Sequence, residues 1–262
     1  MSDRRPGVVL FLTAGDPDLA TTERLLRSAD EHEVDWVELA VPFPDSPTDG
    51  PTIRRSADRA LGGGVGMVDV LSLVARVRPT LRHSRIALLT DWSATLREVG
   101  MGEGLTAVHH SGADAVLVHG LPPRMRAEHD RVTSALGLAV VTTCYAGVSD
   151  ERTLRAAANG APAYIYLVSK YGRTGGTLDT ANDAVATTVS RLRAWTTAPI
   201  AVGFGVRDST HLDAIGAAGA DAAVIGTACV EAVEEGIGGD VLGSFEAFLS
   251  RLGLLRKISS RV

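Results

Sequence analysis

The sequence has only two cysteines, Cys144 and Cys229, and both lie in apolar runs without the spacing of metal ligands. We therefore expect reduced core residues, as in a cytosolic protein, rather than a disulfide framework. An excess of basic residues is also absent, since the formal net charge is −5. This excludes a general electrostatic footprint for nucleic acid or for an anionic membrane. Any anionic ligand must therefore be held by a local site.

A long hydrophobic run is missing as well. The apolar run that follows Pro6 and Gly7 is short and is interrupted at Asp16, so it predicts neither a secretion signal nor a membrane span. Together with the scarce cysteines, this predicts a cytoplasmic protein that binds neither nucleic acid nor membrane.

Eight short apolar runs alternate with segments of helical periodicity along the 262 residues. The runs are nearly continuous in apolar residues, which is typical of parallel strands buried on both faces. Eight such strands predict an α/β protein with a (β/α)₈ TIM barrel, formed as a single domain by residues 1–262; a doubly wound open sheet is the alternative. The expected strands are Val8–Ala14, Asp35–Phe43, Arg85–Thr90, Ala113–His119, Leu138–Ala146, Ala163–Ser169, Ile200–Val206 and Ala222–Gly226.

A repeated sequence motif favours the barrel over the open sheet. SGADAVLV, which begins at Ser111, resembles AGADAAVI, which begins at Ala218 and lies four strands further on, as half-barrel repeats would. Helices are expected over Thr21–Glu31 and Thr180–Trp195, with further helix starts at the carboxylates Asp150 and Asp208. The tail predicts a last amphipathic helix whose inner face is Phe245, Phe248, Leu249 and Leu252.

Three carboxylates are candidates for chemistry, because functional groups of a barrel lie at the C-terminal strand ends and in the loops that follow. Glu38 lies in an otherwise apolar strand, where burial would raise its pKa toward the range in which a carboxyl both donates and accepts protons. The alternative is a structural carboxylate satisfied by backbone or tyrosine hydroxyls. Asp45 and Asp49 follow in a proline-stiffened loop, where each is either functional or an ordinary loop acid.

A second set of residues predicts a phosphate site. Gly205 follows the seventh strand, and Gly226 with Thr227 ends the eighth strand and opens a helix. Loops at these two places, with a helix N-terminus, are the common phosphate cradle of the barrel. Gly175 lies in the glycine-rich loop after the sixth strand, where Arg173 could add a charge.

Other polar residues near strand ends leave alternatives open. Tyr164 and Tyr166 point the same way on the sixth strand, to hydrogen-bond an acid or a substrate or to pack as core tyrosines. Lys170 follows that strand and is either a Schiff-base lysine or a solvated cation of a candidate lid. His119 alone among the seven histidines ends a strand and could face the pocket. The histidines show no metal-site pattern, and no nicotinamide fingerprint follows a strand, so neither a metal nor another cofactor is predicted.

The sequence resembles the tryptophan synthase alpha subunit family from about Phe11 to Glu234. The most specific motif is the stretch ELAVPFPDSPTDGPTI from Glu38 to Ile53, which matches the family signature around two catalytic acids. Further matches are LTAGDP at Leu12, YIYLVS at Tyr164, GRTG at Gly172, GFGV at Gly203 and IGTA at Ile225. The resemblance implies a barrel that cleaves indole-3-glycerol phosphate to indole and glyceraldehyde 3-phosphate without a cofactor.

The resemblance also implies roles for individual residues. Glu38 would protonate ring carbon C3 and help to deprotonate the side-chain hydroxyl, and Asp49 would bind the indole N–H. Tyr166 would orient this pair of acids. The remaining implied contacts are Thr174 closing the lid on Asp49, Phe11 lining the ring pocket, and Gly175, Gly205, Gly226 and Thr227 holding the phosphate.

Departures from the family pattern fall near the ring pocket and the partner surface. The chain has Thr90-Asp-Trp-Ser93 where the family usually has Tyr-x-Asn, and His119-Gly120 where it usually has Asp near the end of strand four. The resemblance implies a beta-type subunit as partner, with the Asp45 loop as contact. Two alternatives to the lyase are a phosphate-binding aldolase acting on another substrate, for example through Lys170, and a catalytically weak subunit that modulates such a partner.

Overall fold

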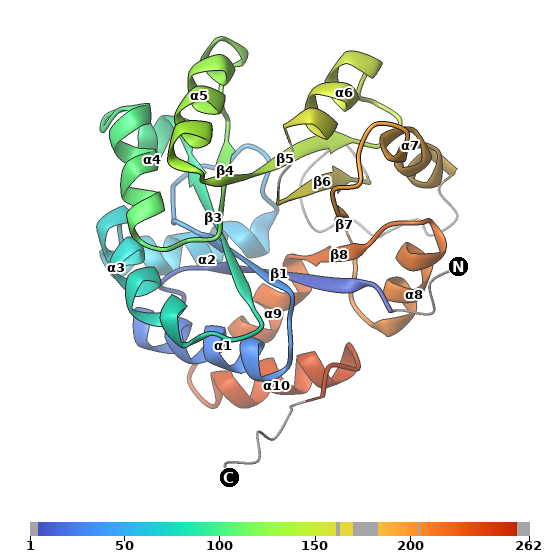
Figure 1. The fold of residues 1–262 in the computed structure, drawn as a ribbon. Coiled ribbons are helices and arrows are strands. Elements are labelled where there is room, and N and C mark those ends of the chain that lie inside the picture. The colour runs from blue at the N-terminus through green and yellow to red at the C-terminus, as the bar shows by residue number, and fades with distance from the viewer. Residues whose placement is uncertain (1–4, 161–162, 170–182, 204, 256–262) are drawn as a thin grey trace.

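The computed structural model describes residues 5–160, 163–169, 183–203 and 205–255. Eight parallel strands close into a barrel in chain order, with β1 paired to β8 (Figure 1). The predicted barrel is therefore confirmed and the open sheet is wrong. The strands are β1 (Gly7–Thr13), β2 (Trp36–Ala40), β3 (Arg85–Asp91), β4 (Ala115–His119), β5 (Ala139–Tyr145), β6 (Tyr164–Val168), β7 (Ile200–Gly203) and β8 (Ala222–Ile225).

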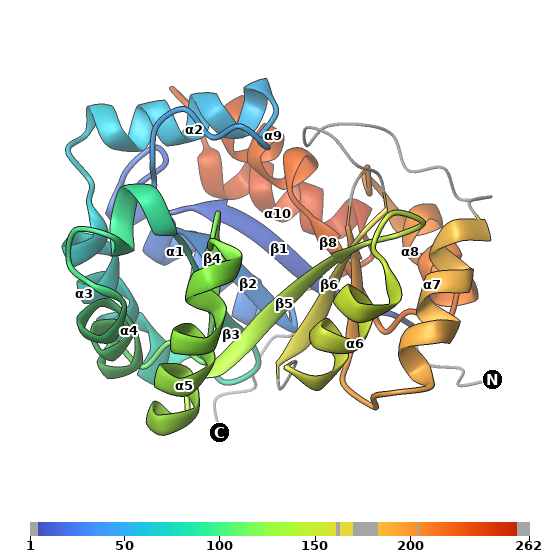
Figure 2. The same ribbon diagram turned by 90° about the horizontal axis from the view of Figure 1, so that it is seen from above.

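Helices surround the strands on the outside of the barrel (Figures 1 and 2). They are α1 (Leu19–Glu31), α2 (Pro51–Gly62), α3 (Met67–Val77), α4 (Met101–His110), α5 (Arg126–Leu136), α6 (Glu151–Asn159), α7 (Asp183–Arg193), α8 (Ser209–Ala217), α9 (Thr227–Glu235) and α10 (Val241–Arg251). The expected starts at Asp150 and Asp208 are confirmed, because these carboxylates accept hydrogen bonds from the first-turn amides of α6 and α8.

Two apolar layers hold the barrel together. The larger one fills the space between strands and helices and includes the predicted inner face of α10, on which Phe245, Phe248 and Leu249 are fully buried. The smaller one lies inside the barrel, where alanines such as Ala87, Ala115 and Ala201 leave room for large side chains from other strands. The ring of Tyr164 fills that room and packs edge-on against Trp36, with centroids 5.3 Å apart.

The repeated motif has a physical cause at the N-terminal ends of the strands. Asp114, which precedes β4, accepts a hydrogen bond from the Ile86 amide of β3 at 2.8 Å. Asp221, which precedes β8, accepts one from the Ile200 amide of β7 at 2.7 Å. Each carboxylate also pairs with an arginine, Arg78 or Arg193 respectively. The repeated Gly-Ala-Asp therefore ties one strand to the preceding one at two places in the barrel.

Predicted strand boundaries differ from the observed ones by a few residues. The second strand was expected to reach Phe43, yet β2 ends at Ala40. Val41 still donates to the Leu89 carbonyl at 2.9 Å, but Pro42 has no amide to continue the pairing. Within the described ranges, no single helix is long and apolar enough to cross a membrane; Pro51–Gly62 and Met67–Thr80 reach that length only together, and they are bent by 95°.

Candidate active site

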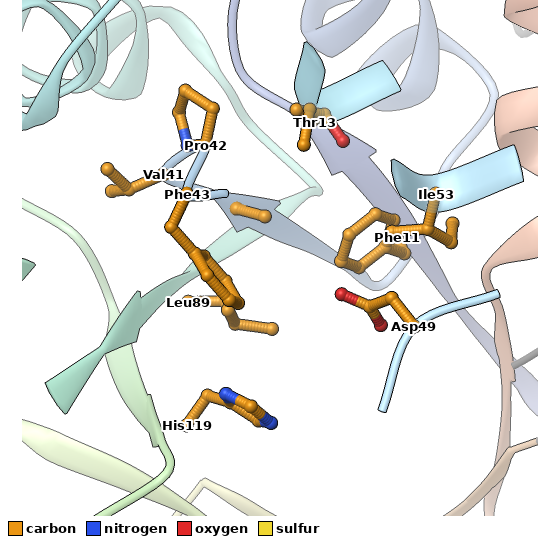
Figure 3. A pocket seen from close by; sticks show the side chains of 11 residues that line it. Phe11, Thr13, Val41, Pro42, Phe43, Asp49, Ile53, Leu89 and His119 are labelled. Carbon is orange, nitrogen blue, oxygen red and sulfur yellow. The ribbon is translucent and has the colours of Figure 1, made fainter. Parts of the chain in front are cut away.

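A pocket opens at the C-terminal ends of β1 to β4, on the side where barrels carry their functional groups (Figure 3). Two expected site residues, Phe11 and Asp49, lie in its wall, and His119 lies across from them. The lining is mostly apolar and consists of Phe11, Thr13, Ala40, Val41, Pro42, Phe43, Asp49, Ile53, Ala57, Leu89 and His119.

Glu38 is a carboxyl group inside the barrel, with 1% of its surface exposed. The strand register places it between Phe11 of β1 and Ala87 of β3, which offer it no charge. Burial in these apolar surroundings raises the pKa of Glu38 to about 7, although the hydrogen bond from Tyr164 acts in the opposite direction. Near neutral pH, its protonated and ionised forms are therefore both well populated, as a group that gives and takes a proton requires.

The hydroxyl that contacts Glu38 belongs to Tyr164, which donates a hydrogen bond to Oε1 at 2.6 Å. The sequence predicts both tyrosines on the inner face of β6, and the family resemblance implies the orienting role for Tyr166. Tyr166 lies two residues further along β6, and the negative charges of Glu38 and Asp49 add to burial in raising its pKa. Its ring is thus within electrostatic reach of both carboxylates. Gly203 makes space for it, since a Cβ at that position would overlap the ring.

Asp49 lies at the end of the β2–α2 loop, directly before the N-cap of α2, and it is half-buried. Burial raises the pKa of Asp49, and the Ser46 hydroxyl, His119 and Arg54 act in the opposite direction. The Arg54 guanidinium also donates two hydrogen bonds to the Ser46 carbonyl, at 2.7 and 3.1 Å. These contacts, with prolines at both ends of the loop, fix a carboxylate at the pocket wall. Asp45 is exposed on the same loop and has a positive φ of 53°.

The candidate phosphate residues lie at the ends of β7 and β8. Gly226 is the N-cap of α9 and has no side chain to offer to the first-turn amides of that helix, which begins at Thr227. The neighbouring helix α8 differs, because Asp208 already supplies a carboxylate to its first turn. The N-terminus of α9 is therefore the one of these two that is open to an anion. Gly205 follows β7 with a φ of +81°, a conformation that favours glycine.

Several predicted residues lie outside the described residues: Thr174 and Gly175, and also Lys170 and Arg173. The two cysteines are free and buried, as predicted. Burial raises the pKa of Cys144 to about 12 and also raises that of Cys229, so neither thiol is a ready nucleophile at neutral pH. Across the described ranges, no three His, Cys, Asp or Glu side chains come together as a candidate metal site.

Comparison with known proteins assigns the barrel to a family. The tryptophan synthase alpha chain family model matches residues 1–246. The tryptophan synthase alpha chain of Nitrosomonas europaea is 35% identical over 252 residues, which cover 96% of this chain and 90% of the relative. That of Gloeobacter violaceus is 36% identical over 249 residues, covering 95% and 89%. The Pyrococcus furiosus tryptophan synthase A-subunit superimposes with a TM-score of 0.83 at 28% identity, covering 96% of this chain and 98% of that one.

The raised pKa of Glu38 predicts a pH-dependent gain in stability for Glu38→Gln. The folded state holds the Glu38 proton up to about pH 7, whereas the unfolded chain loses it near the ordinary glutamate pKa. The proton therefore stabilises the folded state fully below the unfolded pKa, and this stabilisation is lost as pH rises through the folded pKa. A glutamine keeps an oxygen to accept the Tyr164 hydrogen bond and does not titrate. Between about pH 4.5 and pH 8 the free energy of unfolding should therefore shift by about 3 kcal/mol in favour of the variant.

Urea unfolding across this pH range measures the shift. Glu98→Gln, the same change at an exposed position, is the matched control and should follow the wild-type curve. Wild type and Glu38→Gln running parallel over the whole range would contradict the raised pKa.

Proposed function

We propose specific roles for the residues of this chain, which belongs to the tryptophan synthase alpha chain family. The family reaction is the cleavage of indole-3-glycerol phosphate to indole and glyceraldehyde 3-phosphate, so the chain is a carbon–carbon lyase. The observation that carries the proposed roles is the buried Glu38 carboxyl, whose pKa of about 7 suits a group that donates one proton and accepts another.

Glu38 is the proposed proton shuttle. Its carboxyl protonates C3 of the indole ring, and the ring becomes the electron sink for the bond between C3 and the side chain. The resulting carboxylate takes the proton from the adjacent side-chain hydroxyl, which becomes the aldehyde carbonyl of glyceraldehyde 3-phosphate. The electron pair of the broken bond returns to the ring and restores the indole. Glu38 ends protonated, as it began, and no oxidant or reductant is needed.

Asp49 is the proposed partner of the ring nitrogen. Protonation at C3 places positive charge on that nitrogen, and a carboxylate bound to its N–H stabilises the charge as it develops. Tyr166 orients the two acids from β6, in keeping with its electrostatic reach to both. Phe11 lines the pocket beside Asp49 (Figure 3) and is the proposed wall of the ring site. Thr174 is proposed to close over Asp49.

The phosphate is proposed to bind at the open N-terminus of α9. Gly226 and Thr227 would present backbone amides to its oxygens, Gly205 would let the neighbouring loop approach closely, and Gly175 would complete the cradle. The support is the contrast between α8, capped by the Asp208 carboxylate, and α9, whose N-cap is a glycine.

A beta-type subunit is the proposed protein partner, with the Asp45 loop as its contact. Asp45 is exposed and lies four residues before Asp49, so a partner that touches the loop would act close to the reacting groups. A chain of the Pyrococcus furiosus tryptophan synthase α2β2 complex superimposes on this chain with a TM-score of 0.84 at 27% identity. The buried free cysteines support the cytoplasm as the proposed location.

Indole release from indole-3-glycerol phosphate tests the lyase roles. Purified wild-type protein should release indole, and Glu38→Gln should lower kcat by at least about 100-fold, since general acid–base groups contribute on that order. Adding a beta-type subunit should raise the wild-type rate and should raise it less in Asp45→Ala. Release that survives in Glu38→Gln, together with borohydride trapping of substrate on Lys170, would contradict the acid–base account and favour a Schiff-base aldolase.

Gly226→Asp tests the phosphate site. The added carboxylate would accept hydrogen bonds from the first-turn amides of α9 and would repel the phosphate. The KM for indole-3-glycerol phosphate should therefore rise at least about tenfold, because the phosphate loses a charge-assisted interaction. Space permits the change, because a Cβ at Gly226 would meet Phe11 at an ordinary 3.8 Å. Gly66→Asp places the same charge at the N-cap of α3 and should leave the KM unchanged. Equal KM values in the two variants would rule out this end of α9.

A further inference from the structure

Three side chains from different parts of the barrel form a hydrogen-bonded chain at the pocket rim. Nδ1 of His119, at the end of β4, lies 2.9 Å from Oδ2 of Asp91, at the end of β3. Nε2 of the same ring lies 3.0 Å from the hydroxyl of Thr48, in the β2–α2 loop. Both ring nitrogens are therefore engaged, and His119 faces Asp49 across the pocket (Figure 3).

Asp91 is held firmly enough to orient the imidazole. Its Oδ1 accepts a hydrogen bond from the Ala94 amide at 2.8 Å and so caps the helical turn that follows β3. Burial would raise the pKa of Asp91, but the hydrogen bonds from His119 and Ala94 outweigh it and hold that pKa below its usual value. Glycine suits position 120 for two reasons. Its φ of +64° is a conformation that favours glycine, and a Cβ there would crowd Oδ2 of Asp91 at 3.2 Å.

His119 contacts the β2–α2 loop in two ways. Besides the hydrogen bond to Thr48, its ring stacks on that of Phe43, with centroids 5.6 Å apart and planes inclined by 26°. Phe43 and Thr48 lie on opposite sides of the loop turn that contains Asp45. The end of β4 thus fixes both arms of this loop, one through stacking and the other through a hydrogen bond.

The loop residue that this attachment places is Asp49. Thr48 directly precedes Asp49 in the chain, so the hydroxyl contact restrains the backbone that carries the carboxylate. The charged and titratable groups of the described residues that act on Asp49 are His119 from β4, Arg54 from α2 and Tyr166 from β6. Asp91 contacts the imidazole of His119.

We propose that His119, oriented by Asp91, is a positioning residue that holds Asp49 in its reactive place through Thr48 and Phe43. The proposal rests on the proposed function, in which Asp49 stabilises the charge on the ring nitrogen. A group that acts on developing charge contributes to kcat, and small displacements of it are costly. The contacts of His119 are with Asp91 and with Thr48 and Phe43 of the loop, so the proposed effect passes through Asp49.

The two contacts also fix which ring nitrogen carries the proton. A carboxylate only accepts hydrogen bonds, so Asp91 requires a proton on Nδ1. In the neutral imidazole, Nε2 is then the acceptor and the Thr48 hydroxyl is the donor. The hydroxyl of Thr48, rather than its methyl group, is the part that the loop depends on.

Steady-state kinetics on indole-3-glycerol phosphate separate this role from simple packing. Thr48→Val keeps the shape of the side chain and removes the hydroxyl, so kcat should fall on the order of 10- to 100-fold while KM changes by less than about twofold. Thr48→Ser restores the hydroxyl and should recover most of the wild-type kcat. Thr106→Val removes a hydroxyl that bonds only within α4 and should match wild type.

Nuclear magnetic resonance of the imidazole nitrogens supplies a readout that does not depend on activity. In wild-type protein the neutral His119 ring should carry its proton on Nδ1, and Thr48→Val should shift the Nε2 resonance while Nδ1 stays protonated. A ring protonated at Nε2, or a Thr48→Val variant with wild-type kcat, would overturn the proposal. Wild-type kcat in Thr48→Val, with kcat lost in Asp49→Asn, would overturn the role of His119 and leave that of Asp49 in place. Absence of indole release from wild type would instead overturn the proposed function and leave the nitrogen resonances to decide on the hydrogen-bonded chain.

Discussion

The burial of one carboxyl group inside the barrel is the constraint on which the rest of the site depends. An unpaired carboxylate in apolar surroundings is costly. Within the part of the chain that the structure describes, the Tyr164 hydroxyl, 2.6 Å from Oε1 of Glu38, offsets that cost. The cost keeps the proton on Glu38 up to about pH 7. The small alanines of the barrel interior and the large rings of Trp36 and Tyr164 create these surroundings, so the packing of the core sets the proton affinity of the site.

The acid at the pocket rim is less buried and has more polar neighbours. Asp49 is half-buried and has several polar neighbours: Ser46, Arg54 and His119 all counteract the effect of burial on its pKa. Burial raises the pKa of both acids, but at Asp49 the polar and charged neighbours counteract more of that effect than the Tyr164 hydrogen bond does at Glu38. Two carboxyl groups in different environments can then take different roles in one reaction. In the proposed mechanism, Glu38 exchanges protons and Asp49 responds to charge on the ring.

The barrel and the buried acid Glu38 could be predicted from the sequence because those signals are local, whereas only the family resemblance distinguished Asp49 from Asp45. Continuous apolar runs predict buried parallel strands, and an acid inside such a run, as at Glu38, is conspicuous. The hydrogen-bond partners around these acids are not evident from the sequence. Tyr164 is 126 residues from Glu38, and Thr48 is 71 residues from His119, so their pairing depends on how the strands close around the barrel. No periodicity distinguishes Tyr164 from Tyr166, since both point inward. Asp91 and His119 both depart from the family pattern, but 28 residues separate them in the chain, and only the pairing of β3 with β4 brings them into contact.

Titration of the Glu38 carboxyl itself tests the central claim most directly. Protein labelled with carbon-13 at the glutamate side-chain carboxyl would be followed by nuclear magnetic resonance across pH, and Glu38→Gln would identify the resonance that belongs to residue 38. The account predicts a midpoint near pH 7. A midpoint near the ordinary glutamate value of about 4.3 would contradict it, because Glu38 would then be a plain carboxylate at neutral pH.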